Sequence, residues 1–164
     1  MLSIAKDIFL ELKRSKIPYC IWKNLHILEE KSQNNNKSIE YDIYIPYEYK
    51  KVIKKLFFRY KGIQLSPQIH FFPKIYHYYF LDKNGSFLHF HIYFEIFTGD
   101  SFCKDYYLPF GKKILKNRIL IKNCFYVTSS RYENLLTTLR IYLKVSTLLG
   151  LIFYLLDRND YQNQ

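Results

Sequence analysis

The sequence is poor in cysteine, which excludes two classes of small stabilised domain. Among 164 residues there are only three cysteines, Cys20, Cys103 and Cys124. Their odd number and wide spacing provide neither a disulfide framework nor the paired spacing of a zinc site. Free thiols in a reducing compartment are the simplest interpretation, so we expect a cytoplasmic protein.

Long apolar runs are also missing, which argues against a membrane span. The one strongly apolar run, Leu148 to Leu156, is far shorter than the roughly 20 residues that a spanning helix needs. Arg140 and Lys144 precede it. We expect a buried or helix-pairing segment, and an interfacial membrane helix stays open as an alternative. The first residues mix charge into apolar positions at helical spacing, unlike a signal peptide.

The charge is strongly positive, with a net value of +11 from 25 Lys and Arg against 14 Asp and Glu. Such an excess raises the question of nucleic-acid binding. The lysines are scattered, however, and the sequence has no Arg/Gly-rich arm and no known nucleic-acid-binding signature. The composition is skewed toward residues with AT-rich codons, which offers a second source of the charge. The sequence therefore makes no strong case for nucleic acid as a partner.

The periodicity of the apolar residues predicts an α+β fold. Helical spacing predicts a helix over residues 3–15 and a second one that has Pro46 in its first turn and that Gly62 ends, and alternation predicts strands over 39–45 and 86–97. The second strand follows a β-hairpin turn at Lys83-Asn84-Gly85. Further strands are expected in "IPYCIW" and "RILIKNCFYVT". On the helix between Pro46 and Gly62 we expect Val52, Ile53, Leu56, Phe57 and Tyr60 to face the core, which leaves Lys50, Lys51, Lys54 and Lys55 in solvent.

The element order predicts a mixed β-sheet with helices packed on one side, plus a long C-terminal helix over residues 131–156. We divide the chain into an α+β domain, residues 1–128, and a C-terminal helical segment, residues 129–164. The segment is expected to pack on the domain or to extend from it.

Two acidic residues alternate with apolar ones in "IEYDIYI", Ile39 to Ile45. Because a strand points successive side chains to opposite faces, Glu40 and Asp42 share one face. Two interpretations stay open: the wet face of a half-buried strand, or a metal site. Magnesium prefers oxygen ligands and usually takes one or two carboxylates plus substrate phosphates. In nucleotidyl transfer such ions neutralise the transferring group and align the attack.

The strand Ser86 to Phe97 carries an unusual polar face, with His89 and His91 two residues apart. Imidazole binds metals or phosphate oxygens. If this strand lies beside the acidic one, two carboxylates and two imidazoles meet on one face. We therefore predict that the strands are neighbours, with the Asp42 and His91 side chains within two strand spacings, about 10 Å.

Four segments resemble a known family in their order: "IPYCIWKNLHIL", "IEYDIYI", "LHFHIYFEIFTGDSFCKDYYLP" and "YENLLTTLRIYLK". They are similar to nucleotidyltransferase-fold domains, related to the DNA polymerase β superfamily, that precede thymidylate kinase-like domains in some bacterial surface-polysaccharide proteins. The resemblance covers residues 1–145. It implies a nucleotidyltransferase-like fold and Mg²⁺-dependent transfer of a nucleoside monophosphate from a nucleoside triphosphate to a hydroxyl acceptor. It also implies a role in polysaccharide biosynthesis and a kinase-like partner domain or protein.

By position, the resemblance implies Glu40 and Asp42 as catalytic, metal-binding residues. It implies a phosphate-binding role for the segment that replaces the family's Gly-Ser pair, here Trp22-Lys23-Asn24, and for His89. His91 stands where the family normally has a third carboxylate, so the resemblance implies it as the catalytic base.

Three departures from the family keep other functions open. The Gly-Ser pair is missing, Glu40 stands where Asp is usual, and His91 replaces the third acid. These departures leave a two-metal mechanism undecided. The first alternative is a degenerate, non-catalytic domain that binds a nucleotide or a partner. The second is a basic protein that binds nucleic acid or a membrane surface.

Overall fold

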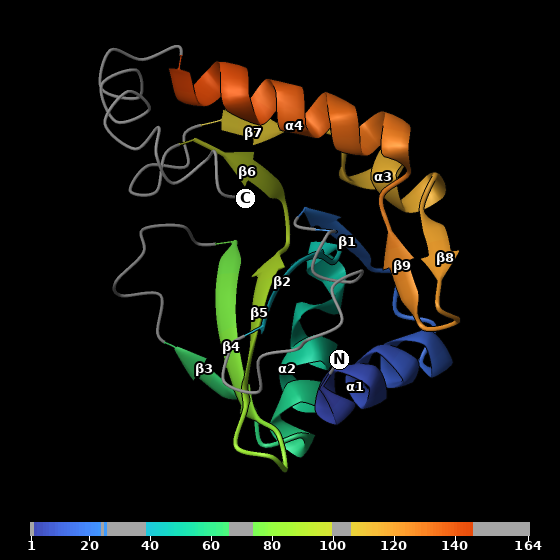
Figure 1. Ribbon diagram of the computed structural model, residues 1–164, viewed down its shortest axis with the longest axis vertical. Coiled ribbons are helices and arrows are strands. Elements are labelled where there is room, and N and C mark those ends of the chain that lie inside the picture. Colours follow the sequence, from blue (N-terminus) through green and yellow to red (C-terminus); the bar gives the residue numbers. More distant parts are fainter. Residues whose placement is uncertain (1, 24, 26–38, 66–73, 100–105, 146–164) are drawn as a thin grey trace.

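The computed structural model describes residues 2–23, 25, 39–65, 74–99 and 106–145 (Figure 1). A seven-stranded mixed sheet has the strand order β3-β4-β5-β2-β1-β9-β8, and β6 and β7 form a separate two-stranded sheet. The strands are β1 (Cys20–Lys23), β2 (Ile39–Tyr44), β3 (Ile63–Leu65), β4 (Ile75–Leu81), β5 (Phe87–Tyr93), β6 (Ile96–Thr98), β7 (Tyr106–Leu108), β8 (Ile119–Ile121) and β9 (Phe125–Val127). The helices are α1 (Ser3–Arg14), the 3₁₀ helix η2 (Tyr47–Tyr49), α2 (Lys50–Arg59), α3 (Gly111–Lys116) and α4 (Ser130–Val145).

The expected α+β architecture with a mixed sheet and a C-terminal helix is confirmed. The helix α4 begins at Ser130, and the remainder of the helix expected up to residue 156 lies outside the described residues. The hairpin between β4 and β5 is also confirmed, and Gly85 adopts the positive φ of 76° that its turn requires. In the described part of the chain, no helix combines the length and the apolar character that a membrane crossing requires.

Helices α1 and α2 cover one face of the sheet (Figure 1). The buried residues of α1 recur at helical spacing: Ala5, Ile8, Phe9 and Leu12. Those of α2 are Ile53, Leu56 and Phe57. They pack against the apolar side chains of β2 and β5, such as Ile43 and Phe90, so the alternation of these strands builds the main core.

The solvent face of α2 is as expected at three of its four lysines. Lys51, Lys54 and Lys55 are exposed, whereas Lys50 is half-buried and lies over the ring of Tyr76. Placing Val52 in the core was wrong, because its side chain is 48% exposed. A ten-residue helix packed on a sheet buries only a narrow stripe, and the position before Ile53 falls outside it.

The expectation that the helices pack on one side was wrong in part. Helices α3 and α4 contact a second apolar cluster on the other face of the sheet, which includes Cys20, Trp22, Tyr44, Tyr93 and Ile96. The reason is that β1 is apolar on both faces, since Ile21 joins the main core whereas Cys20 and Trp22 join the second cluster. The expected strand 86–97 is also broken, between β5 and β6. Phe94 joins the main core and Ile96 the second cluster, so simple alternation fails at this break.

The N-terminus of α1 is capped by a residue from a distant turn. Its own N-cap, Leu2, makes no side-chain hydrogen bond, and the first turn holds no acidic residue. Instead, Asp82 Oδ1 accepts hydrogen bonds from Ser3 Oγ at 2.8 Å and from the backbone N–H of Ile4 at 3.2 Å. A carboxylate at this position satisfies a free N–H group and complements the helix dipole.

Replacing Asp82 with alanine is expected to lower the free energy of unfolding by about 1 kcal/mol at neutral pH. Burial raises the pKa of this carboxyl, but the hydrogen bonds from Ser3 and Ile4 outweigh it, so the pKa lies below its ordinary value of 3.8. A folded-state pKa below the unfolded one stabilises the protein above about pH 4 and ceases to do so as pH falls through the folded value. Urea unfolding between neutral and acidic pH measures this.

The matched control is Asp7→Ala, which changes an exposed carboxylate on the same helix. Its effect should stay within about 0.5 kcal/mol. A difference between wild type and Asp82→Ala that is unchanged down to the lowest pH would contradict the cap.

Candidate functional site

Two cross-strand rows of polar side chains lie on the sheet face opposite α1 and α2. Strand β2 pairs with β5 in parallel, which places Glu40 opposite His89 and Asp42 opposite His91. The prediction that these strands are neighbours is confirmed, since His91 Nδ1 lies 3.1 Å from Asp42 Oδ1. We call Glu40, Asp42, His89 and His91 the carboxylate–imidazole cluster.

The hairpin strand β4 extends both rows. Its antiparallel pairing with β5 puts His77 opposite His91 and Tyr79 opposite His89. The His77 and His91 rings stack with centroids 4.1 Å apart, and those of Tyr79 and His89 with centroids 4.5 Å apart. A distance of 2.9 Å between His77 Nδ1 and His89 Nε2 places one imidazole within hydrogen-bond reach of the other. The cluster therefore continues into a stack of aromatic rings.

A β-bulge in β1 adds a cation to the second row. Ile21 pairs with Ile43, but the register then shifts, so that Lys23 instead of Trp22 lies opposite Asp42. Lys23 Nζ lies 2.8 Å from Asp42 Oδ1 and donates a hydrogen bond of 3.0 Å to the hydroxyl of Tyr93. The bulge thus brings the Lys23 ammonium group into contact with the Asp42 carboxylate.

Asp42 and Lys23 form a buried ion pair. The Asp42 side chain is fully buried, and that of Lys23 is 15% exposed. Burial raises the pKa of Asp42, but the hydrogen bond from His91 and the charge of Lys23 outweigh it and hold the pKa below its ordinary value. Burial lowers the pKa of Lys23, and Asp42 opposes this shift. Asp42 is therefore ionised at neutral pH.

Glu40 is the solvent-facing end of the cluster, with a side chain that is 42% exposed. Its Oε2 lies 3.3 Å from His89 Nδ1, and its Oε1 lies 3.5 Å from His91 Nδ1. Hydrogen bonds from these two imidazoles hold the pKa of Glu40 well below its usual range. One carboxylate therefore faces solvent while the other is covered.

Tyr93 closes the buried end of the cluster. Its hydroxyl lies 3.2 Å from His91 Nδ1, and its ring packs edge-on against Trp22. Burial, followed by the negative charge of Asp42, raises the pKa of Tyr93 well above its ordinary value. The hydroxyl therefore keeps its proton at neutral pH and serves as a neutral hydrogen-bonding group between Lys23 and His91.

The donor set that the sheet assembles could hold one divalent ion. Glu40, Asp42 and His91 each offer a ligand atom, and these atoms lie within 4.8 Å of one another. A second ion is less well provided for, because in the described ranges no third carboxylate joins the group. Glu95, the nearest acid along the chain, pairs with Lys74 instead. The residues present match a single-ion site better than a two-ion centre.

The structure brings only some of the remaining predicted site residues together. Lys23 and His89 lie at the carboxylate–imidazole cluster, as described. Trp22 is only 2% exposed and belongs to the second apolar cluster. Asn24 lies outside the described residues.

Two further residues near the site were not expected from the sequence: His77 and Tyr79. A signal for both existed. Counting back from the Lys83-Asn84-Gly85 turn sets the hairpin register, which pairs His77 with His91 and Tyr79 with His89. The contribution of Tyr93 depends on the cation that the bulge brings to its hydroxyl.

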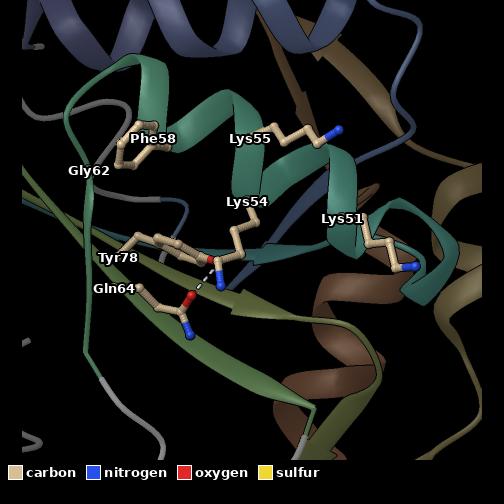
Figure 2. Close-up of a pocket in the computed structure, with 7 residues that line it drawn as sticks. All are labelled: Lys51, Lys54, Lys55, Phe58, Gly62, Gln64 and Tyr78. Carbon is tan, nitrogen blue, oxygen red and sulfur yellow. Dashed lines mark hydrogen bonds between the residues drawn. The ribbon is translucent and has the colours of Figure 1, made fainter.

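A separate hollow of about 520 Å³ lies on the other face of the sheet, between α2 and the edge strands (Figure 2). Its lining residues are Lys51, Lys54, Lys55, Phe58, Gly62, Gln64 and Tyr78. The Tyr78 hydroxyl donates a hydrogen bond of 3.3 Å to Gln64 Oε1 at its floor. Because this lining contains no carboxylate and no imidazole, it does not share the chemistry of the cluster.

Comparisons with known proteins found no match for the chain. No protein-family model matches it, and no curated protein or solved structure matches it either. The function of the chain therefore has to be inferred from the geometry of its own residues.

Proposed function

We propose that the chain is a Mg²⁺-dependent nucleotidyltransferase, which moves a nucleoside monophosphate from a nucleoside triphosphate to a hydroxyl acceptor. The observation that carries the proposal is the convergence of Glu40, Asp42 and His91, with ligand atoms within 4.8 Å, on one face of a rigid sheet. The solvent-facing carboxylate of Glu40 makes this face accessible to a ligand. A sheet fixes such positions better than a loop does.

In this proposal the two carboxylates bind the ion and His91 acts as the general base. Glu40 and Asp42 are the ligands, and a bound Mg²⁺ would neutralise charge on the phosphate groups. The contacts of His91 with Glu40, Asp42 and Tyr93 are all made by Nδ1. With a proton on Nδ1, Nε2 carries the free lone pair and can take a proton from the attacking hydroxyl. From the family resemblance we further propose that the chain acts in surface-polysaccharide biosynthesis together with a kinase-like partner.

A second candidate is a non-catalytic domain that binds a nucleotide or a partner. The observation that favours it is the Lys23 ammonium group, 2.8 Å from Asp42 Oδ1. This cation already compensates the buried carboxylate, so the free protein does not need a metal ion for charge balance. A transferase must then weaken this contact when the ion binds.

The experiment that tests the transferase is isothermal titration calorimetry with ATP, GTP, CTP and UTP, each with and without Mg²⁺. We expect Mg²⁺-dependent binding of at least one nucleotide, which Glu40→Gln abolishes. Because the contacts of Glu40 with the two histidines are partly exposed, this variant should change stability by no more than about 1 kcal/mol. Lost binding would then not be a folding defect.

The matched control is Lys54→Gln, which changes a charge on the opposite face of the sheet. It should bind the nucleotide as the wild type does. Binding that is independent of Mg²⁺ and unaffected by Glu40→Gln, without release of pyrophosphate, would support the non-catalytic domain. Failure of all four nucleotides to bind would refute the transferase.

A further inference from the structure

A second cation approaches the site from α4. The guanidinium carbon of Arg140 lies 5.8 Å from the centre of the Trp22 ring, and Lys23 Nζ lies 5.5 Å from the same centre. Helix α4 contacts β1, which carries both Trp22 and Lys23. One buried indole ring therefore holds two cationic groups from distant parts of the chain next to the carboxylate–imidazole cluster.

The charges of these two groups are not equally compensated. Lys23 has Asp42 as its counter-ion. Among the described residues, Arg140 forms no ion pair with a carboxylate; its contact is the face of Trp22. Because both cationic groups lie against the same Trp22 ring, their like charges repel each other. A bound anion would relieve this repulsion.

The indole itself adds an unused donor. Trp22 Nε1 is buried and has no hydrogen-bond partner in the described ranges. Most buried polar groups have such a partner, and an unpaired donor costs free energy. The ring thus brings together an ammonium group, an unsatisfied N–H group and a guanidinium that has no carboxylate partner among the described residues, and all three favour negative charge nearby.

We propose that Arg140 and Lys23 form an anion-binding subsite for the phosphate groups of a polyphosphate ligand, beside the carboxylate–imidazole cluster. The planar guanidinium group suits this role, because its N–H groups match two phosphate oxygens at once. Identification of the ligand as the triphosphate of a nucleotide rests on the proposed function, whereas the subsite itself does not. In that case the carboxylates engage the metal ion and Arg140 engages the phosphate oxygens.

The test uses sodium tripolyphosphate without Mg²⁺, so that it is independent of the metal. Trp22 is the only tryptophan of the chain, and its fluorescence reports directly on this position. We expect the wild type to show a saturable change in emission that sodium chloride of equal ionic strength does not produce. Calorimetry should give at least tenfold weaker binding for Arg140→Gln, as expected for loss of a charged hydrogen-bonding group.

Two further variants keep the test decisive. Arg131→Gln removes an exposed charge from the same helix and should bind tripolyphosphate as the wild type does. Arg140→Lys retains the charge but lacks the planar fork, so its affinity should lie between those of the wild type and Arg140→Gln. If circular dichroism shows that Arg140→Gln does not fold, the comparison of Arg140→Lys with the wild type decides.

The subsite is refuted if the wild type does not bind tripolyphosphate, or if the Arg140 variants bind it as tightly as the wild type does. Its failure can be told apart from failure of the transferase. Arg140-dependent binding of tripolyphosphate without any binding of nucleotide and Mg²⁺ would retain the subsite and refute the transferase. Glu40-dependent nucleotide binding that Arg140→Gln leaves unchanged would retain the transferase and refute the subsite.

Discussion

Replacing Asp42 with asparagine is expected to lower the free energy of unfolding by about 3 kcal/mol, because it leaves the Lys23 ammonium group buried without a counter-ion. The side chain of Asp42 is fully buried, and its Oδ1 lies 2.8 Å from Lys23 Nζ. Urea unfolding followed by circular dichroism measures the change. The same variant should lose any Mg²⁺-dependent nucleotide binding, which makes Glu40→Gln the cleaner test of the ligand.

A double-mutant cycle isolates the pair. Lys23→Met combined with Asp42→Asn removes both charges, so the double variant should be more stable than the sum of the single changes predicts. Glu95→Gln is the control, because the Lys74–Glu95 pair is partly exposed and its loss should cost less than about 1 kcal/mol. An Asp42→Asn variant of wild-type stability, or strict additivity in the cycle, would show that the buried pair does not form.

Replacing Phe9 with alanine is expected to lower the free energy of unfolding by about 3–5 kcal/mol. Phe9 is fully buried in the main core. Its ring lies within 5.5 Å, centre to centre, of four other aromatic rings: those of Tyr19, Tyr41, Phe90 and Phe125. Truncation removes all of these contacts at once and leaves a cavity between α1 and the sheet. Urea denaturation of both proteins gives the difference.

Phe58→Ala is the matched control for this change. It makes the same truncation on α2, but at a side chain that is 80% exposed. Its effect should stay within about 0.5 kcal/mol. Equal destabilisation by the two variants would mean that α1 does not pack on the sheet through Phe9.

The local patterns in the sequence were sufficient for most of the fold. Alternation in residues 39–45 and helical spacing in α1 each place the apolar side chains on one face. The sequence therefore predicts which face of each element packs against the core. The matched polar faces of β2 and β5 also predicted their pairing. Alternation failed at Phe94 and Ile96, because a break in the backbone sends these side chains to different clusters.

The site was only half predictable, for a physical reason. The cluster depends on strand alternation, which the sequence displays. The position of Lys23 depends on a bulge, because a regular strand would place Trp22 opposite Asp42 instead. The position of Arg140 depends on how α4 docks against β1, a tertiary contact with no local signature. The contact of Lys23 with Asp42 and the position of Arg140 therefore became visible only in the folded chain.

The strand order has a consequence for how the protein is made. In the sheet, β1 lies between β2 and β9, and β9 follows it by about a hundred residues along the chain. At a synthesis rate of roughly 5–20 residues per second, β1 waits about 5–20 s on the ribosome before its second neighbour exists. During that time the edge of β1 next to Lys23 can pair with the wrong strand. The nascent chain is thus a candidate client for chaperones until Phe125–Val127 emerge and close the gap.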